Sequence, residues 1–177
     1  MAVKSVDGLS ASLEDYLEAI YHIQSTHRVA RAKEIAEALK VSRGSVTGAL
    51  KSLAEKGLVD YSPYSYVTLK AEGEAIAREI IRRHGILKQF FTELLQLAPE
   101  TAEANACRVE HAVDPETIDR LVCFLEFLKA CPRSGDSWLA SFTTYCHEGI
   151  DRKRCAQCLS ELKATRNPSE QEGTPQI

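Results

Sequence analysis

The chain has 177 residues, of which 44% are hydrophobic and 27% are charged, so it is long enough for one medium-sized domain or two small ones. No apolar run approaches the roughly 18 residues that a membrane-spanning helix needs. The segment 1–12 lacks the apolar core of a secretory signal, so we expect a cytoplasmic protein without membrane contact. The net charge of −3 argues against a generally basic coat for nucleic acid, so any DNA contact must be confined to a local positive surface.

The N-terminal part of the sequence predicts three helices. Residues 12–24, SLEDYLEAIYHIQ, have the apolar spacing of an amphipathic helix, with Ser12 as its N-cap. A short helix is expected over residues 31–40, and a third helix begins after Ser42 as N-cap and ends near Gly57. Two short helices separated by a tight polar turn form a helix-turn-helix, whose second helix can enter the major groove of DNA.

A β-hairpin is predicted directly after the third helix. The two strands cover residues 58–61 and 66–69, and a proline-containing turn at residues 62–65 joins them. A hairpin in this position is the wing of a winged helix-turn-helix domain.

Three further helices are expected after the wing. They cover residues 72–97, 100–112 and 115–130, and the last of them follows an Asp-Pro start signal. Its apolar face is rich enough to pack between chains as well as within one chain. We interpret this region as a helical dimerisation and sensing unit.

We therefore predict a mainly α-helical protein with four segments. They are a winged helix-turn-helix DNA-binding domain at 10–73, a helical dimerisation and metal-binding domain at 74–130, a small cysteine-rich C-terminal lobe at 131–162 and a disordered tail at 163–177.

The segment 105–121, NACRVEHAVDPETIDRL, carries a thiol, a carboxylate and an imidazole close together. Cys107, Glu110 and His111 are at positions i, i+3 and i+4, so on a helix they project from one face, which is the geometry of a metal site. The alternative is that the glutamate and the histidine lie on a solvated face while the cysteine packs as a small hydrophobic residue.

The third helix offers polar side chains for DNA contacts. The candidates for phosphate and base contacts are Ser42, Arg43, Ser45, Thr47 and Lys51. Gly44 and Gly48 add nothing to base readout, so we expect specificity to depend on few side chains and on DNA shape. For each serine, helix capping or plain solvation is the alternative.

The cysteine content suggests a second site. Six cysteines in a reducing compartment are more consistent with thiols or metal ligands than with disulfides. Four of them lie in the C-terminal lobe: Cys131, Cys146, Cys155 and Cys158. They could hold Zn(II) or an iron–sulfur cluster, although their spacing is irregular, and free or redox-active thiols are the alternative.

Several segments together resemble the DtxR/MntR family of metal-dependent transcriptional regulators. They are SLEDYLEAIY, the helix-turn-helix with SVTGALKSLAEKGLV, the hairpin YSPYSYVTLKAEG, RRHGILKQFF and CRVEHAVDPETIDRL, and the similarity runs from about residue 10 to residue 128 in the family's order. The resemblance implies a homodimeric repressor that binds double-stranded operator DNA when loaded with Fe(II) or Mn(II), and that controls genes of metal homeostasis. It also implies metal ligands at six matching positions: Asp15, Glu18, His84, Cys107, Glu110 and His111.

The ligand set mixes features of the iron and manganese regulators. Cys107 resembles the iron-responsive relatives, whereas Asp15 resembles the manganese-responsive ones, and because a thiolate favours softer metals we favour Fe(II). The chain departs from the iron regulators at Lys88, where they have a carboxylate, and at Glu103, where a histidine is expected. A second metal at His84 is therefore in doubt, unless Glu18 and Glu110 act as bridging carboxylates.

Two other functions are open from the sequence. An enzyme reading would make Glu110 and His111 a hydrolytic metal centre, but the chain has no nucleophile motif, phosphate loop or HExxH, so we do not expect an enzyme. A redox, zinc or iron–sulfur sensor on the same winged-helix scaffold, switched by the C-terminal cysteines, is the stronger alternative.

Overall fold

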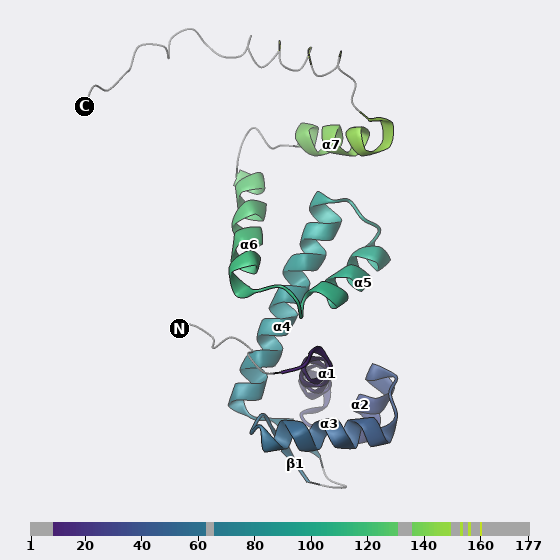
Figure 1. Cartoon of the computed structure of the whole chain (residues 1–177), viewed down its shortest axis with the longest axis vertical. Coiled ribbons are helices and arrows are strands. Elements are labelled where there is room, and N and C mark those ends of the chain that lie inside the picture. The colour runs from purple at the N-terminus through teal and green to yellow at the C-terminus, as the bar shows by residue number, and fades with distance from the viewer. Residues whose placement is uncertain are drawn as a thin grey trace, which may run out of the picture. The chain divides into compact units, whose positions relative to one another are not determined.

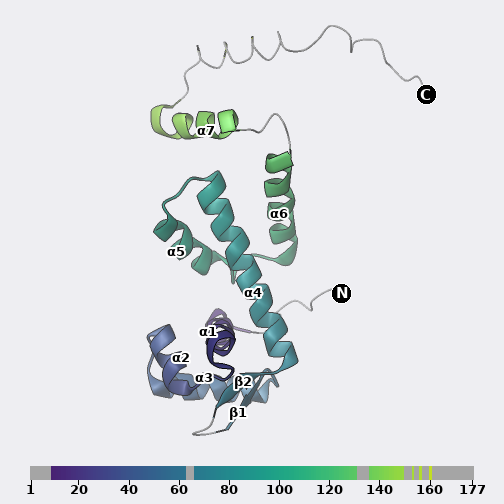
Figure 2. The ribbon, with the colours of Figure 1, turned by 180° about the vertical axis from the view of Figure 1, so that it is seen from behind.

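The structure is a computed structural model, and it describes residues 9–62, 66–130 and 136–149 together with the single positions 153, 156 and 160. The chain divides into two compact units, residues 1–126 and residues 127–177. Figures 1 and 2 show the ribbon from two opposite sides.

The first helix, α1, spans Ala11–His27. Its N-cap is Ser10, whose side-chain oxygen accepts a hydrogen bond from the backbone N–H of Leu13 at 3.4 Å. The prediction of Ser12 as the cap was therefore wrong, because Ser12 already lies in the first helical turn while Ser10 has the extended backbone of a cap residue. The helix ends at Arg28, which adopts a left-handed conformation with φ 66°.

The helix-turn-helix consists of α2, Ala32–Leu39, and α3, Arg43–Glu55. Ser42 caps α3 as predicted, because its hydroxyl accepts a hydrogen bond from the N–H of Ser45 at 3.1 Å. Gly57 follows the helix with φ 76°, a conformation that glycine adopts without strain. The apolar faces of these helices and α1 meet in one core, whose fully buried members include Leu17, Ile20, Ile35, Leu50 and Leu53.

The predicted wing is a two-stranded antiparallel sheet. Strand β1, Val59–Tyr61, pairs with β2, Val67–Leu69, each strand being one residue shorter than expected. Residues 63–65 of the connecting turn lie outside the described part of the chain. Ala30, between α1 and α2, exchanges backbone hydrogen bonds with Val67, so the hairpin is attached to the helical core.

Helix α4, Ala71–Gln89, extends from the hairpin past α1 to the second half of the unit (Figure 1). Gly73 makes its start possible, because a Cβ there would lie 2.1 Å from the backbone oxygen of Leu58. The prediction of one regular helix over 72–97 was wrong at its end, where a π-helical turn, η1 at Phe90–Leu94, continues α4. In a π-helical turn each backbone hydrogen bond joins residues five apart, one more than in an α-helix, so the turn is wider.

Two more helices complete the described part of the first unit. Helix α5, Pro99–Val109, ends three residues earlier than predicted, so Glu110 is its C-cap and His111 lies in the turn that follows. Glu110 still has helical backbone angles, and its N–H donates to Ala106 at 3.0 Å. Helix α6 spans Pro115–Ala130 and continues into the second unit.

A small core holds the helical half together. Leu87, Ala106 and Ile118 are its buried members, contributed by α4, α5 and α6. In the second unit, α7 covers Asp136–Glu148, a helix that we had not predicted. None of the described helices combines the length and the apolar character needed to cross a bilayer.

Candidate metal centre

Three donor side chains converge where α1 meets the end of α5. The Nε2 atom of His111 lies 3.0 Å from Oδ1 of Asp15 and 3.3 Å from Oε1 of Glu110. One donor atom from each of the three residues lies within 4.8 Å of the others. The two parts of the chain that contribute these donors are separated by almost a hundred residues of sequence.

The three residues fit a divalent first-row metal ion. Oε1 of Glu110 and Nε2 of His111 are buried without a hydrogen-bond partner among the described residues, which is costly unless another group satisfies them. Neighbouring donors around an ion with bonds of about 2.1 Å are separated by about 3.0 Å in octahedral geometry and about 3.4 Å in tetrahedral geometry. The observed 3.0 and 3.3 Å agree with this spacing, and carboxylate and imidazole donors suit Mn(II), Fe(II) or Zn(II).

Glu14 is a part of this centre that the sequence analysis missed. Its carboxylate is only 5% exposed, and Oε2 lies 2.6 Å from Nδ1 of His111. One signal could have revealed it, because Glu14 precedes Leu17 and Tyr21 by three and seven residues and so falls in the apolar stripe of the helix, where a carboxylate needs a buried partner.

His84 lies beside the three donors but differs from His111 in its contacts. Its Nδ1 is 2.6 Å from Oε2 of Glu110, and its Nε2 is 3.2 Å from Oε1 of Glu103. The ammonium of Lys88 is 2.7 Å from the other oxygen of Glu103. Lys88 and Glu103, the two departures from the iron regulators, therefore form an ion pair with each other, and both nitrogens of His84 face carboxylates.

Burial and charge shift the pKa values of the central groups. Burial raises the pKa of Glu110, although its hydrogen bond with His84 opposes the shift. Burial alone would lower the pKa of His111, but the hydrogen bond with Glu14 and the surrounding carboxylates outweigh it, so the pKa is raised. Lys88 lowers the pKa of Glu103 by hydrogen bonding. The carboxylates thus create a negative potential in which a cation is favoured.

Cys107 and Glu18 lie at the edge of the centre. Cys107 is on the exposed side of α5, and the pKa of its thiol is raised, first by partial burial and then by neighbouring carboxylates that include Glu110, Asp15 and Glu18. Glu18 lies 3.5 Å from the imidazole of His22. Neither residue belongs to the group of converging donor atoms formed by Asp15, Glu110 and His111.

The predicted DNA-contact residues lie on the outer side of α3. Ser42, Arg43, Ser45 and Lys51 are exposed, whereas Thr47 is half-buried. Hydroxyl groups of this helix are also used within it, since Thr47 donates to the carbonyl of Arg43 at 2.9 Å and Ser42 caps the helix.

One cation beside the wing escaped the sequence analysis. Arg31 donates to the hydroxyl of Tyr66 at 3.3 Å, and its guanidinium lies 5.2 Å from the centre of that ring. Arg31 and Tyr66 join the start of α2 to the wing.

The predicted C-terminal cysteine site is only partly visible. Cys146 is exposed on α7, whereas Cys131, Cys155 and Cys158 lie outside the described residues. Zn(II) or an iron–sulfur cluster at these cysteines therefore stays a prediction.

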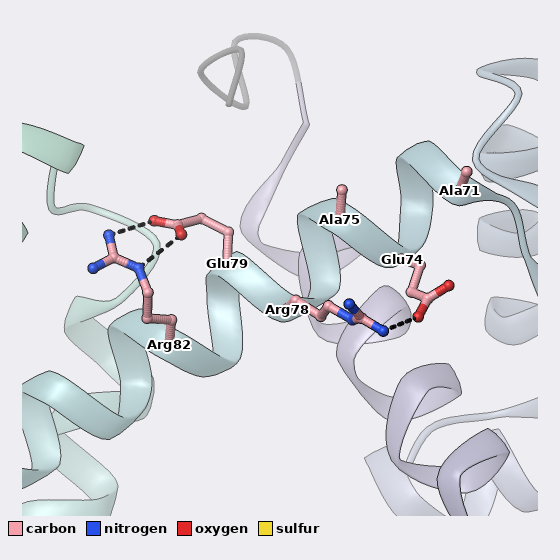
Figure 3. Close-up of a pocket in the computed structure, with 6 residues that line it drawn as sticks. All are labelled: Ala71, Glu74, Ala75, Arg78, Glu79 and Arg82. Atoms are coloured by element: carbon pink, nitrogen blue, oxygen red, sulfur yellow. Dashed lines mark hydrogen bonds and ion pairs between the residues drawn. The ribbon is translucent and has the colours of Figure 1, made fainter. Parts of the chain in front are cut away.

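A separate hollow of about 400 Å³ runs along one side of α4 (Figure 3). It is lined by Ala71, Glu74, Ala75, Arg78, Glu79 and Arg82. Arg78 pairs with Glu74, and Arg82 pairs with Glu79 at 2.9 Å, so the charges along this face neutralise each other. The hollow contains none of the three converging donors.

Two family models match successive parts of the chain. Residues 8–67 match the family model of the iron-dependent repressor N-terminal DNA-binding domain. Residues 70–139 match the model of the iron-dependent repressor metal-binding and dimerisation domain.

Individual relatives match over much of the chain. An uncharacterised HTH-type transcriptional regulator of Methanocaldococcus jannaschii is 38% identical over 122 residues, which cover 68% of this chain and 98% of the relative. The HTH-type transcriptional regulator MntR of Lysinibacillus sphaericus is 31% identical over 121 residues, covering 68% of this chain and 86% of the relative.

Two solved structures that share the fold are longer than this chain. A manganese-dependent transcriptional repressor in complex with manganese matches with a TM-score of 0.60 and 31% identity, over 65% of this chain and 53% of that chain. The metal-dependent transcriptional regulator MtsR matches with a TM-score of 0.61 and 28% identity, over 72% and 59%. The chain thus spans little more than half the length of these proteins. From the two family models, these relatives and the shared winged-helix fold, we conclude that the chain belongs to the DtxR/MntR family of iron- and manganese-dependent transcriptional repressors.

Proposed function

We propose that this chain represses transcription by binding operator DNA as a homodimer when Asp15, Glu110 and His111 hold Fe(II) or Mn(II). The observation that carries the proposal is a pair of buried donor atoms, Oε1 of Glu110 and Nε2 of His111, which face a carboxylate of α1 and have no hydrogen-bond partner in the described part of the chain. Family membership supports a regulator rather than an enzyme.

The position of α1 explains how metal binding would alter DNA affinity. Helix α1 packs against both α2 and α3, and it carries Asp15 near its N-terminal end. A bound ion supplies positive charge that offsets the carboxylates. Asp15 then stays fixed against Glu110 and His111, so α1 and the recognition helix α3 lose freedom relative to α5. The two recognition helices of a dimer must match half-sites about 34 Å apart. If metal has already restricted their positions, less conformational entropy is lost when DNA binds.

The choice between the two metals depends on Cys107. The converging donors are two carboxylates and one imidazole, which suit Mn(II) as well as Fe(II). The raised pKa of Cys107 keeps its thiol protonated at neutral pH, so this residue does not offer a thiolate until a metal displaces the proton. We therefore propose that both Mn(II) and Fe(II) activate the chain. If Cys107 becomes a ligand, we expect it to bind Fe(II), the softer of the two ions.

The first test measures metal-dependent DNA binding. An operator-like duplex is selected from a random-sequence library with the Mn(II)-loaded full chain. Its affinity is then measured by fluorescence anisotropy at fixed salt with chelator, Mn(II), anaerobic Fe(II) or Zn(II). We expect at least tenfold tighter binding with Mn(II) or Fe(II) than with chelator, about 1.4 kcal/mol of coupling.

Two histidine variants make this test specific. His111→Ala should lose the metal response, because it removes a converging donor. His27→Ala, at the exposed end of the same helix that carries Asp15, should keep it. Equal affinity of the unmodified chain in chelator and in every metal would refute the proposed function.

A further inference from the structure

The buried carboxylate of Glu14 calls for an explanation beyond helix stability. A carboxylate in the first turn of a helix is favoured by the helix dipole, but it gains that benefit while exposed to water. Glu14 is instead 5% exposed, and burial of a charged carboxylate is unfavourable unless a partner compensates. Its partner is Nδ1 of His111 at 2.6 Å, a residue 97 positions later in the chain.

The contacts of His111 divide between its two ring nitrogens. Nδ1 faces Glu14, whereas Nε2 faces Asp15 and Glu110. A ring that donates its Nδ1–H to a carboxylate keeps the lone pair of Nε2 for a metal, and the hydrogen bond also fixes the orientation of the ring. Because Glu14 and Asp15 are consecutive, the same turn of α1 contacts both edges of the imidazole.

We propose that Glu14 is a positioning residue of the metal centre: it holds the His111 ring so that Nε2 points at the ion, without touching the ion itself. The inference deepens the proposed function and depends on it. Loss of such an outer partner typically weakens metal binding by 10- to 100-fold.

The test is a double-mutant cycle on metal affinity. Mn(II) and Zn(II) binding to the full chain are measured by calorimetry, with a competing chelator, at one pH and salt concentration. Glu14→Ala should raise the dissociation constant about 10- to 100-fold. In a His111→Ala background the same substitution should change it less than twofold, because the ring that Glu14 orients is already absent.

Two further variants separate hydrogen bonding from charge and from helix stability. Glu14→Gln should give an intermediate affinity, since an amide oxygen still accepts the Nδ1–H but carries no charge. Glu100→Gln is the matched control, because Glu100 is an exposed first-turn carboxylate of α5, and its metal affinity should equal that of the unmodified chain.

A spectroscopic measurement reads the orientation directly. In the Zn(II)-loaded chain with ¹⁵N-labelled histidine, two-bond proton–nitrogen correlations report which nitrogen of His111 carries hydrogen. We expect Nδ1–H in the unmodified chain and a loss of this single form in Glu14→Ala. Should Glu14→Ala not fold, Glu14→Gln and the spectrum of the unmodified chain decide the matter.

The outcomes distinguish the inference from the function on which it depends. A Glu14→Ala chain with lower thermal stability but unchanged metal affinity and unchanged Nε2 coordination would show a purely structural role and overturn the inference alone. If the unmodified chain binds neither Mn(II) nor Zn(II), the proposed function and the inference both fail.

Discussion

At the scale of single residues, the two histidines of the centre have different surroundings. His111 has one nitrogen directed at the converging donors, and this nitrogen lacks a hydrogen-bond partner among the described residues. His84 has a carboxylate at each nitrogen, with Glu103 held in turn by Lys88. A nitrogen that donates a hydrogen bond cannot also donate a lone pair to a metal. We infer from these contacts that His84 orients Glu110, while its role as a metal ligand stays a prediction.

This difference predicts unequal effects of the two alanine substitutions. His111→Ala should reduce Mn(II) affinity more than 100-fold, because a donor is lost, whereas His84→Ala should reduce it roughly tenfold, as expected for an outer partner. Calorimetric titration of both variants, with circular dichroism to verify folding, measures the ratio. An equal loss in both would mean that His84 is a ligand of the same rank.

Cys107 gives a second prediction at this scale. Cys107→Ser should change Mn(II) affinity less than threefold, because the thiol is outside the converging group and its raised pKa disfavours the thiolate. Competition titrations with Mn(II), Zn(II) and anaerobic Fe(II) check this. A loss above tenfold for Mn(II) would make Cys107 a primary ligand.

The sequence predicted part of this centre and could not predict the rest. Spacing suggested Glu110 and His111, and the family resemblance added Asp15; the three residues lie together in the structure. The apolar stripe of α1 could have marked Glu14 as buried, but its partner His111 lies 97 residues later, and no local pattern identifies that partner. The distinction between His84 and His111 likewise depends on which carboxylate each ring nitrogen meets.

At the scale of secondary-structure elements, types were easier to predict than boundaries. The helices of the DNA-binding half and the hairpin are present, because caps and apolar periodicity are local signals. The end of α5 was misplaced, since Glu110 keeps helical angles while the chain already turns toward Asp114, which caps α6 by accepting from the N–H of Thr117 at 2.9 Å. The π-helical turn after Gln89 has no local signal that we recognised.

Two glycines of α4 provide a matched test of packing. Gly73→Ala should destabilise the fold by about 1–3 kcal/mol or more, because the new methyl group would collide with the backbone of Leu58, which cannot move as a side chain does. Gly85→Ala, in the same helix with nothing within 4 Å of the new Cβ, should stabilise it by about 0.8–1.0 kcal/mol. Urea unfolding of both metal-free variants measures these changes, and similar stability of the two would contradict the close approach.

At the scale of the whole molecule, a charge network joins α4 to α6. Arg83 is 6% exposed and donates to Glu79, which also accepts from Arg82, and Arg82 lies 3.5 Å from Asp119 of α6. Burial alone would raise the pKa of Glu79, but the hydrogen bonds from the two arginines outweigh it, so the pKa is lowered. The ionised form of Glu79 is thus favoured by folding.

The sign of this shift gives a pH prediction. A carboxyl group whose pKa is lower in the folded state stabilises the fold above its unfolded pKa, about 4.3 for glutamate, and this contribution is lost as pH falls through the folded pKa. Glu79→Gln should therefore be less stable than the unmodified chain at pH 7, with a difference that shrinks in acid. Urea unfolding from pH 7 to pH 3 in chelator measures the difference, and a constant offset at all pH values would contradict the assignment.

Helix α1 contacts both the core of the DNA-binding half and the candidate metal centre, and this affects how such a regulator would behave in a cell. Leu17 and Ile20 fix α1 in the core of the DNA-binding half, while Asp15 of the same helix faces His111. Linkage is reciprocal. If metal binding raises the affinity of the chain for an operator, operator binding must raise its affinity for metal by the same factor. Chains bound to DNA would then retain their ion at metal concentrations where free chains release it. As the metal concentration falls, repression would therefore end later than the loss of metal from unbound chains.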